Sequence, residues 1–475
     1  MGSNFDLSEL LNSDSPVSLR RQISLVWHLS IPGMLAQISS ILMQYIDAAM
    51  VGFLGAEQSA SIGLVASSTW VMGSLLHALC IGFTVQTAHL VGAGEKFKAR
   101  NLLFNALLCC GIFSLLLLSL GAALSFRLPL WLGAGPEIFD DAFWYFLIFC
   151  LSAPFFEVVY LLSGMLQCSG NMKIPGFLNA LMCFLDIAFN FVFIFGCGLG
   201  VKGAALGSAC AALVTALLFL YFTLFKSECF ALFGFWGSRR EKTCFYLDWS
   251  AVKKAVKLAF PVAVESSAFS GALVVVTKIV APLGAVSLAA NSFATTAESL
   301  CYMPGYGIAE AATTLVGQSF GARRQELVRS FSWITVIYGI VLMTGMGLAM
   351  YFACPLVFNF ITPNPAIRRL SVEVLRIELF AEPLFGASIV AMGALRGRGD
   401  TFVPSLLNLF SLWVVRLSLS VLLVKSYGLK GIWFAMAVEL CFRGIILLLR
   451  LTQTLQFRSG RGCRRFRCIP RRRDL

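Results

Sequence analysis

Four oxygen-bearing side chains in the first half of the chain could together hold a cation or a proton. Asp47 lies in one apolar stretch, while Asp186 and Asn190 lie four residues apart in another and therefore share one face of a helix. Ser208, in the following apolar stretch, lies at a depth that could meet them. Carboxylate, amide and hydroxyl oxygens are hard ligands that suit Na⁺, and a carboxylate can also hold a proton. The alternatives are a solvated helix end for Asp47 and a structural hydrogen bond between Asp186 and Asn190.

The second half of the chain carries a different set of ionisable residues within its apolar stretches. Glu265, Glu382 and Arg416 are predicted to bind a solute or a second cation. Arg416 also needs an acidic partner, for which these two glutamates are the candidates. Glu439 and Arg443 are four residues apart, so we expect them to form an ion pair on one helix face. Two further acids could equally line a cavity or have structural roles, namely Glu298 and Glu310.

These residues lie in a chain with the composition of a membrane protein. Of its 475 residues, 58% are apolar and 13% are charged, whereas a soluble domain has about 25% charged residues. Runs of about 20 apolar residues follow one another, each long enough to cross a ~30 Å hydrocarbon core as a helix. We therefore predict an all-α integral membrane protein with twelve transmembrane helices, at 23–50, 60–90, 101–126, 140–166, 175–197, 202–225, 255–281, 288–318, 330–355, 369–395, 402–425 and 430–455.

The two halves of the chain repeat one another at an offset of 229 residues, as from Pro32 to Pro261. Six further pairs keep this offset, namely Gly55 and Gly284, Gly92 and Gly321, Pro154 and Pro383, Gly164 and Gly393, Gly170 and Gly399, and Pro175 and Pro404. Such a duplication is typical of secondary transporters. It indicates two six-helix lobes, and because six is an even number, the two lobes share one orientation in the membrane.

The repeat sets the expected domain organisation. We predict a cytoplasmic N-terminal segment, an N-lobe, a cytoplasmic linker, a C-lobe and a basic cytoplasmic tail, at 1–22, 23–225, 226–254, 255–455 and 456–475. Pro32 and Pro261 lie at matching depth in the first helix of each lobe, where a proline frees a carbonyl and permits bending. We predict hinges there, with helix packing as the equal alternative. The acids of the N-lobe are not repeated, because Val276 and Val415 occupy the positions that correspond to Asp47 and Asp186.

The basic residues predict the orientation. The formal net charge is +13, and Lys and Arg are concentrated in the loops after even-numbered helices, in the linker and in the tail, which places both termini in the cytoplasm. The eight arginines of 458–475 favour contact with anionic lipid over nucleic-acid binding. The sequence contains no GxxxxGK[ST] motif, so it does not suggest an ATP-driven pump.

The 15 cysteines do not form a recognisable metal or redox motif. No CxxC pair occurs, and cysteines within the apolar stretches, such as Cys80 and Cys110, are predicted to behave as small apolar residues. Cys463 and Cys468 flank arginines in the tail, where metal binding or acylation is a minor alternative. We therefore predict no cofactor.

Three stretches resemble one known family of transporters. The first predicted helix contains QYIDAAMVGFLG at 44–55, the eighth contains MPGYGI at 303–308 and TLVGQSFGA at 314–322, and the tenth ends in GALRGRGDT at 393–401. Together they resemble the multidrug and toxic compound extrusion (MATE) family, in its prokaryotic type. The resemblance covers about residues 23–455. It implies a V-shaped pair of six-helix lobes and cation-coupled export of organic, often cationic, compounds.

The resemblance also assigns expected roles to individual residues. Asp47 is similar to the family's aspartate in the first helix, which belongs to the N-lobe cation site. One prokaryotic branch carries Asn and then Asp four residues on in the fifth helix, whereas here Asp186 precedes Asn190, and Ser208 falls where that branch has threonine. Glu265 resembles the acidic residue that some branches carry in the seventh helix. A looser match, about one turn from an acidic position in the tenth helix, is Glu382.

We therefore expect a secondary active exporter rather than an enzyme, in which H⁺ or Na⁺ enters as an organic solute leaves. Its expected partners are small organic solutes and membrane lipids, without nucleic acid, and it is expected to work as a monomer. The alternative is a flippase for lipid-linked compounds or oligosaccharides within the wider superfamily, which would show more helices and a cationic cavity. A membrane enzyme would need clustered His or Asp motifs, and a channel would show flux without coupling to a gradient.

Overall fold

The structure is a computed structural model that describes residues 17–231 and 245–456, nearly all of them in helices. Within these residues, nine helical segments are long and apolar enough to cross a membrane. One of them, Phe402–Gln456, contains two helices, because Gly428 at φ 56° and ψ −136° reverses the chain inside it. Two further crossings are α10 and the broken helix α12–α13, so the predicted twelve-helix layout is confirmed.

The N-lobe consists of six long helices and several short elements. In chain order they are α2 (Leu19–Gly52), α3 (Ala56–Gly92), α4 (Lys96–Leu124), α5 (Arg127–Trp131), α6 (Pro136–Cys168), α7 (Lys173–Phe191) with the π-helical turn η1 (Val192–Gly196), and α8 (Gly200–Tyr221) with η2 (Phe222–Lys226). The first helix begins at Leu19, four residues before the predicted start. Residues 1–16 lie outside the described part of the chain.

The C-lobe repeats this order after the linker. Its elements are α9 (Trp249–Val280), η3 (Ala281–Leu283), α10 (Ala285–Gly321), α11 (Gln325–Ile361), α12 (Pro365–Glu378), α13 (Glu382–Gly397), α14 (Phe402–Phe410), η4 (Ser411–Arg416) and α15 (Leu417–Gln456). The first of these begins inside the stretch predicted as linker. The central linker residues 232–244 and the basic tail at 457–475 lie outside the described part of the chain, so their predicted roles stay predictions.

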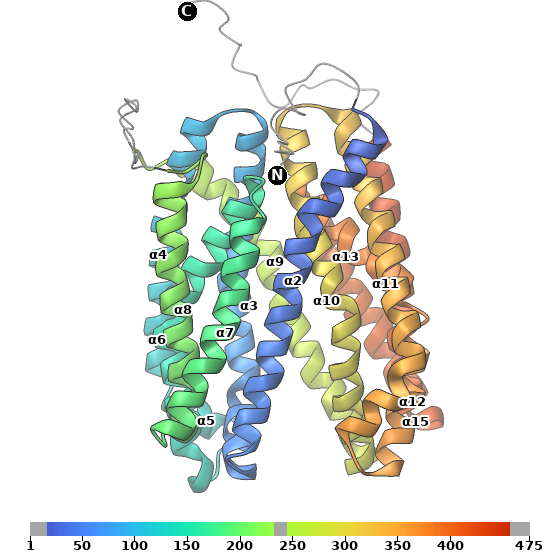
Figure 1. The fold of residues 1–475 in the computed structure, drawn as a ribbon. Coiled ribbons are helices and arrows are strands. Elements are labelled where there is room, and N and C mark those ends of the chain that lie inside the picture. The colour runs from blue at the N-terminus through green and yellow to red at the C-terminus, as the bar shows by residue number, and fades with distance from the viewer. Residues whose placement is uncertain (1–16, 232–244, 457–475) are drawn as a thin grey trace, which may run out of the picture.

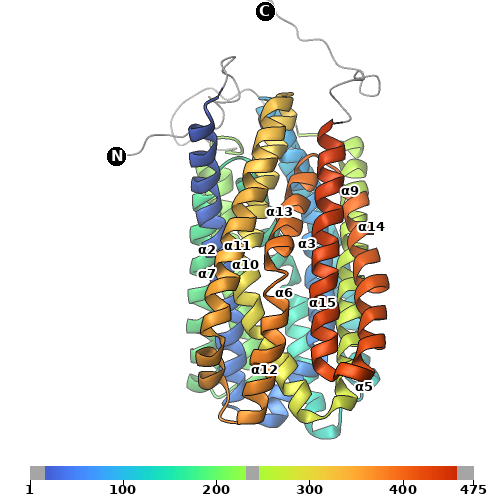
Figure 2. The same ribbon diagram turned by 90° about the vertical axis from the view of Figure 1, so that its right-hand side faces the viewer.

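Two helices cross between the lobes. Figure 1 shows α2 and α9 running between the group α3–α8 and the group α10–α15. The most extensive contacts between the halves are those of α2 with α10 and of α9 with α3. We call the end of the bundle where α2 begins and α15 ends the terminal end, which is uppermost in Figures 1 and 2. The two groups of helices approach each other there and splay apart toward the opposite end.

Glycines allow α2 and α10 to touch at backbone distance. A Cβ atom on Gly33 would lie 2.9 Å from the carbonyl oxygen of Gly307, and one on Gly307 would lie 2.3 Å from the nitrogen of Met34. Neither contact leaves room for a side chain, so the glycines set how closely the two helices approach. Pro32 lies beside this contact and Pro261 lies at the corresponding place in α9, each within a continuous helix. Their hinge role stays a prediction.

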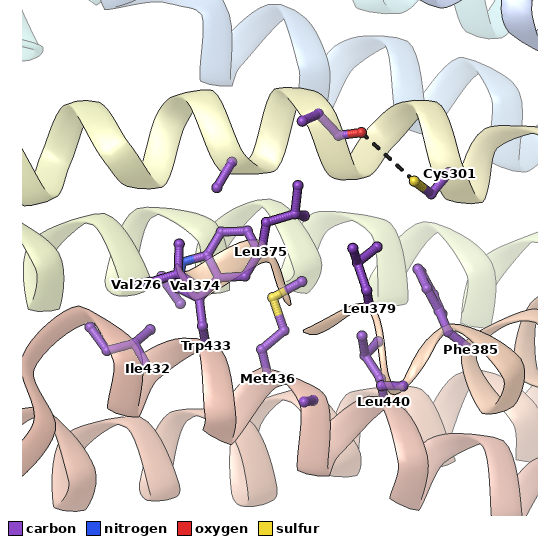
Figure 3. Packing of buried hydrophobic residues seen from close by; sticks show 14 of the residues in the cluster. Val276, Cys301, Val374, Leu375, Leu379, Phe385, Ile432, Trp433, Met436 and Leu440 are labelled. Carbon is purple, nitrogen blue, oxygen red and sulfur yellow. Dashed lines mark hydrogen bonds between the residues drawn. The ribbon is translucent and has the colours of Figure 1, made fainter. Parts of the chain in front are cut away.

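The core of the C-lobe is an apolar cluster in which Trp433 is the largest side chain, shown in Figure 3. Trp433 packs among Val276, Leu375 and Met436, while its indole N–H donates a 3.0 Å hydrogen bond to Asn291. Because lipid chains are as apolar as these side chains, close packing rather than transfer out of water stabilises such a cluster in a membrane. Val276 belongs to this core, which explains why the C-lobe carries no acid at that position.

Candidate cation site and inter-lobe contacts

The structure places the four predicted N-lobe residues together. Asn190 in α7 donates through Nδ2 to Asp47 Oδ1 in α2 at 2.8 Å and to Asp186 Oδ2 at 3.1 Å. The carboxylates of Asp47 and Asp186 lie near each other, and Ser208 in α8 lies near the carboxylate of Asp186. Their convergence depends on three helices, because one turn of α7 supplies two of the side chains and α2 and α8 pack on either side.

Two oxygens in this site have no hydrogen-bond partner among the described residues. They are Asp186 Oδ1 and Asn190 Oδ1, on side chains that are 0% and 1% exposed. A buried oxygen of this kind is costly unless a proton, a cation or water meets it. Two neighbouring carboxylates, that of Asp186 buried and that of Asp47 half-buried, are likewise favoured by a positive charge between them. The arrangement can therefore hold one proton or one small cation.

Gly207 in α8 makes room for Asn190, and sequence reasoning missed it. A Cβ atom on Gly207 would lie 2.0 Å from Asn190 Oδ1 and 2.8 Å from its backbone nitrogen. Gly203, four residues earlier, has its nearest contact at 2.8 Å on the backbone of Phe193. The GxxxG spacing of these two glycines is a known signal for close helix packing in membranes, and it could have identified this contact.

Glu265 in α9 is held in a polar network of its own lobe. It accepts hydrogen bonds from Ser405 Oγ at 2.5 Å and from Asn408 Nδ2 at 2.6 Å. Its charged partner is Arg396, with Nη2 3.8 Å from Oε2. These bonds join α9 to α13 and α14, so Glu265 links helices as well as presenting a carboxylate.

The expected partners of Arg416 are corrected by the structure. Among the described residues, no ion pair within 4 Å joins Arg416 to Glu265 or Glu382: Glu265 pairs with Arg396, and Arg416 Nη2 lies 2.7 Å from Met436 Sδ. Arg416 is the last residue of η4, a π-helical turn that interrupts the α-helical pattern. The predicted pair of Glu439 and Arg443 is confirmed, with Nε 3.3 Å from Oε1.

A buried acidic cluster lies near Arg416. Glu298 in α10, Glu378 at the end of α12 and Glu382 at the start of α13 are 4%, 0% and 0% exposed. Both carboxylate oxygens of Glu378 and of Glu382 lack a hydrogen-bond partner among the described residues. With Glu439, these acids outnumber the two neighbouring arginines, so the cluster favours an added proton or cation. Glu378 was missed by sequence reasoning, although it lies four residues before Glu382.

At the terminal end, the lobes are joined by two hydrogen bonds that the repeat relates to each other. His89 Nε2 in α3 donates to the carbonyl oxygen of Gly397 in α13 at 2.7 Å. Gln318 Nε2 in α10 donates to the carbonyl oxygen of Cys168 in α6 at 2.8 Å. Both the donors and the acceptors are 229 residues apart, so each bond is the counterpart of the other across the pseudo-two-fold axis.

A pair of glycines brings the same helices into contact. A Cβ atom on Gly92 would lie 2.0 Å from the carbonyl oxygen of Gln318, and one on Gly321 would lie 2.1 Å from that of His89. These glycines also correspond under the repeat. The terminal end is therefore closed by a symmetric contact in which α3 and α10 touch backbone to backbone.

Comparison with protein families identifies the chain. The MatE family model matches residues 32–192 and 261–422, two stretches that begin at the repeated prolines. The chain belongs to the MatE family. The resemblance seen in the sequence is thereby confirmed, and the protein is a multi-pass membrane transporter of this family.

Proteins similar to this MatE chain extend over almost its whole length. A protein described as probable multidrug resistance protein NorM from Thermotoga maritima is 28% identical over 428 residues, which cover 89% of this chain and 90% of that protein. A protein of the same description from Chromobacterium violaceum is 25% identical, covering 95% and 98%.

Solved structures are similar to it in fold. One described as the outward-facing conformation of a multidrug resistance MATE family transporter has a TM-score of 0.87 at 20% identity, covering 95% of this chain and 98% of that one. A transporter of the MOP superfamily from Pyrococcus furiosus has a TM-score of 0.84 at 20% identity, with the same coverage.

Proposed function

We propose that this protein is a secondary active exporter that couples the entry of H⁺ or Na⁺ to the export of organic, cationic or amphipathic compounds. The observation that carries the proposal is the buried site in which Asn190 bridges the carboxylates of Asp47 and Asp186. It is also supported by the similar proteins that are described as multidrug resistance proteins. The terminal end is proposed to face the cytoplasm, because basic residues are concentrated in its loops.

A cation at this site can influence the contact between the lobes through α2. Tyr45 lies two residues before Asp47 and donates its hydroxyl hydrogen to the carbonyl oxygen of Thr296 in α10, at 2.7 Å. The same hydroxyl lies 2.5 Å from Ser299 Oγ. Binding of a cation neutralises Asp47, which changes the forces on the segment of α2 that holds this inter-lobe bond. A ligand shifts a conformational equilibrium only if it binds the two states differently, and we propose that the link through Tyr45 provides this difference.

The C-lobe is proposed to contact the solute or a second ion. Glu265, Glu382 and Arg416 lie in a lobe that has no counterpart of the N-lobe acids. The unpartnered oxygens of Glu382 support this assignment, since a positively charged group would satisfy them. No cofactor takes part in the proposed cycle, and one chain suffices for it.

The proposal is tested with inside-out membrane vesicles in which Na⁺ and pH gradients are imposed separately. The Asp47→Asn variant keeps the shape of the side chain and removes its charge, so we expect gradient-driven transport of a fluorescent organic cation to fall to background. The matched control is Asp140→Asn, an acid whose side chain is 69% exposed and pairs with Lys202. This control should transport at the wild-type rate.

Two results would contradict the proposal. One is wild-type transport by a well-folded Asp47→Asn protein. The other is transport by the wild-type protein that ignores both gradients, which would indicate a channel.

A further inference from the structure

Two cysteines and a glutamate from three different helices meet inside the N-lobe. They are Cys80 in α3, Cys110 in α4 and Glu157 in α6, and their donor atoms all lie within 4.8 Å of one another. Each of the three residues is 1% exposed. Cys80 Sγ lies 3.5 Å from Glu157 Oε1, while Glu157 Oε2 has no hydrogen-bond partner among the described residues.

The donor set and its spacing suit a thiophilic metal ion. Zinc binds cysteine sulfur at about 2.3 Å and carboxylate oxygen at about 2.1 Å, which puts neighbouring ligands of a tetrahedral site about 3.5 Å apart. The measured Sγ to Oε1 distance agrees with this value. Exchange of two thiol protons for one Zn²⁺ leaves the net charge unchanged, so binding at this depth carries no penalty from an added charge. The carboxylate of Glu157 then supplies a third ligand.

The other lobe shows that the fold does not need these side chains. The positions that correspond to Cys80, Cys110 and Glu157 under the repeat are Ala309, Gly339 and Gly386. There the helices pack closely, and a Cβ atom on Gly386 would lie 3.0 Å from the carbonyl oxygen of Gly339. Small apolar residues therefore satisfy the packing at this place in the scaffold. The three metal-binding side chains are an addition found in one lobe.

A cavity of about 170 Å³ adjoins the cluster. Cys110 and Glu157 line it, together with Gly111 and Ser114. The rest of the lining is apolar, namely Leu107, Leu115, Pro154, Val158 and Leu161. The cavity has room for one water molecule as a fourth ligand, held by the metal itself and by the polar groups of Glu157 or Ser114. The cluster lies about 18 Å along α3 from the end of that helix at Gly92.

We propose that Cys80, Cys110 and Glu157 form a binding site for Zn²⁺ or a similar thiophilic cation. This site is separate from the oxygen site at Asp47, because its ligands come from α3, α4 and α6 rather than from α2, α7 and α8. A bound ion would cross-link three helices of the N-lobe. This site could not be predicted from the sequence, since its ligands lie 30 and 47 residues apart and fit no short metal motif.

The test is metal binding by the purified full-length protein in detergent, with Zn²⁺ alone as the probe. Wild type is expected to hold one more equivalent of tightly bound Zn²⁺ than Cys80→Ser or Cys110→Ser. Cys109→Ser changes the neighbouring cysteine, which lies outside the cluster, and should keep wild-type stoichiometry. Substitution by Co²⁺ should give the visible absorption of tetrahedral thiolate coordination in wild type and in Cys109→Ser, and not in the other two.

A second variant covers the case in which the serine substitutions disturb folding. Glu157→Gln keeps both thiols and the shape of the side chain, and it should weaken Zn²⁺ binding by at least about tenfold, since even outer-shell partners contribute about 10- to 100-fold to metal affinity. Equal binding by wild type, Cys80→Ser and Glu157→Gln would overturn the proposal. So would a disulfide between Cys80 and Cys110 in the protein isolated under non-reducing conditions, detected by mass spectrometry.

Discussion

At the scale of single residues, the N-lobe site is organised by an amide. Asn190 uses both hydrogens of its Nδ2 group, one for each carboxylate, and so holds Asp47 and Asp186 at a fixed separation. Its own Oδ1 is left free of protein donors among the described residues. An incoming cation therefore meets oxygens whose positions are already set, which lowers the cost of arranging them on binding.

The site is predicted to depend on the absence of a side chain at Gly207. In Gly207→Ala the new methyl group would occupy the space of Asn190 Oδ1, so the amide must move away from the two carboxylates. We expect a loss of stability of about 1–3 kcal/mol, the usual effect of overpacking, and a large loss of gradient-driven transport. Gly345→Ala is the matched control, because a Cβ atom there would meet nothing within 4 Å. Equal gradient-driven transport by Gly207→Ala and Gly345→Ala would contradict this prediction, because it would show that the position of Asn190 does not affect transport.

Residue type, spacing and depth were enough to predict which N-lobe side chains meet. They were not enough to predict what holds them, because Gly207 acts through the space that it leaves. In the C-lobe the expected ion pair of Arg416 with Glu265 or Glu382 is not formed among the described residues, and the π-helical turn η4 that carries Arg416 was not predicted. Glu378 was overlooked because its position at a helix break, beside Glu382, becomes evident only in three dimensions.

At the scale of elements, the start of α9 is docked onto α4 by side chains. Asp248 is the N-cap of α9 and accepts hydrogen bonds from the backbone N–H groups of Ser250 and Ala251. Its own N–H donates to Asn105 Oδ1 at 2.9 Å, and the N–H of Tyr246 donates to Asn101 Oδ1 at 3.0 Å. The two asparagines of α4 thus fix where the chain leaves the linker and enters the C-lobe.

Asp248 is expected to contribute a pH-dependent part of the stability. Hydrogen bonds from Ser250 and from the backbone of Ala251 hold the pKa of Asp248 below its usual value. An acid whose pKa is lower in the folded than in the unfolded state stabilises the fold at pH values above its unfolded-state pKa. This stabilisation is lost as the pH falls through the folded-state pKa. Asp248→Ala should therefore cost about 0.5–2 kcal/mol at neutral pH, and less in acid. Thermal unfolding of wild type and Asp248→Ala at neutral and at acidic pH measures this loss of stability. An equal loss at the two pH values would contradict the assignment.

Helix number and order were predictable from apolar runs and the repeat, but one break was not. The tenth predicted helix, 369–395, is divided into α12 and α13, with Pro383 in the first turn of α13. Its counterpart Pro154 lies inside the continuous helix α6, so the repeat pointed to an unbroken helix. The break lies between Glu378 and Glu382, two buried acids that end α12 and begin α13.

At the scale of the whole molecule, closure of the terminal end depends on paired contacts. The bonds of His89 and Gln318 are related by the repeat, and each one joins opposite lobes. A typical hydrogen bond contributes about 0.5–1.5 kcal/mol. Removal of both should therefore favour opening of this end by about 1–3 kcal/mol, without change to either lobe.

The double variant His89→Ala, Gln318→Ala tests this expectation. Hydrogen exchange at the ends of α3 and α10 should become faster, while exchange inside each lobe stays the same. Ser119→Ala provides the control, because the exposed hydroxyl of Ser119 donates to the carbonyl oxygen of Leu115 in its own helix. Unchanged exchange in the double variant would mean that the glycine contacts alone keep the end closed.

The helices of the two lobes repeat each other but their buried acids do not, which suggests that the two lobes have different tasks. The N-lobe site contains a bridged pair of carboxylates, whereas the C-lobe cluster mixes acids with Arg416 and Arg443 and leaves Glu382 unpartnered among the described residues. Neutralising Asp47 should therefore abolish gradient-driven export. Glu382→Gln should instead change the range of solutes and their apparent affinity, because it removes a charge that a cationic solute would meet.

Glu373→Gln is the control, an acid of α12 that pairs with Arg369 and Lys430 near the surface. The measurement is the ion dependence of export for several solutes in each variant. A change of ion dependence in Glu382→Gln, together with none in Asp47→Asn, would place the coupling site in the C-lobe.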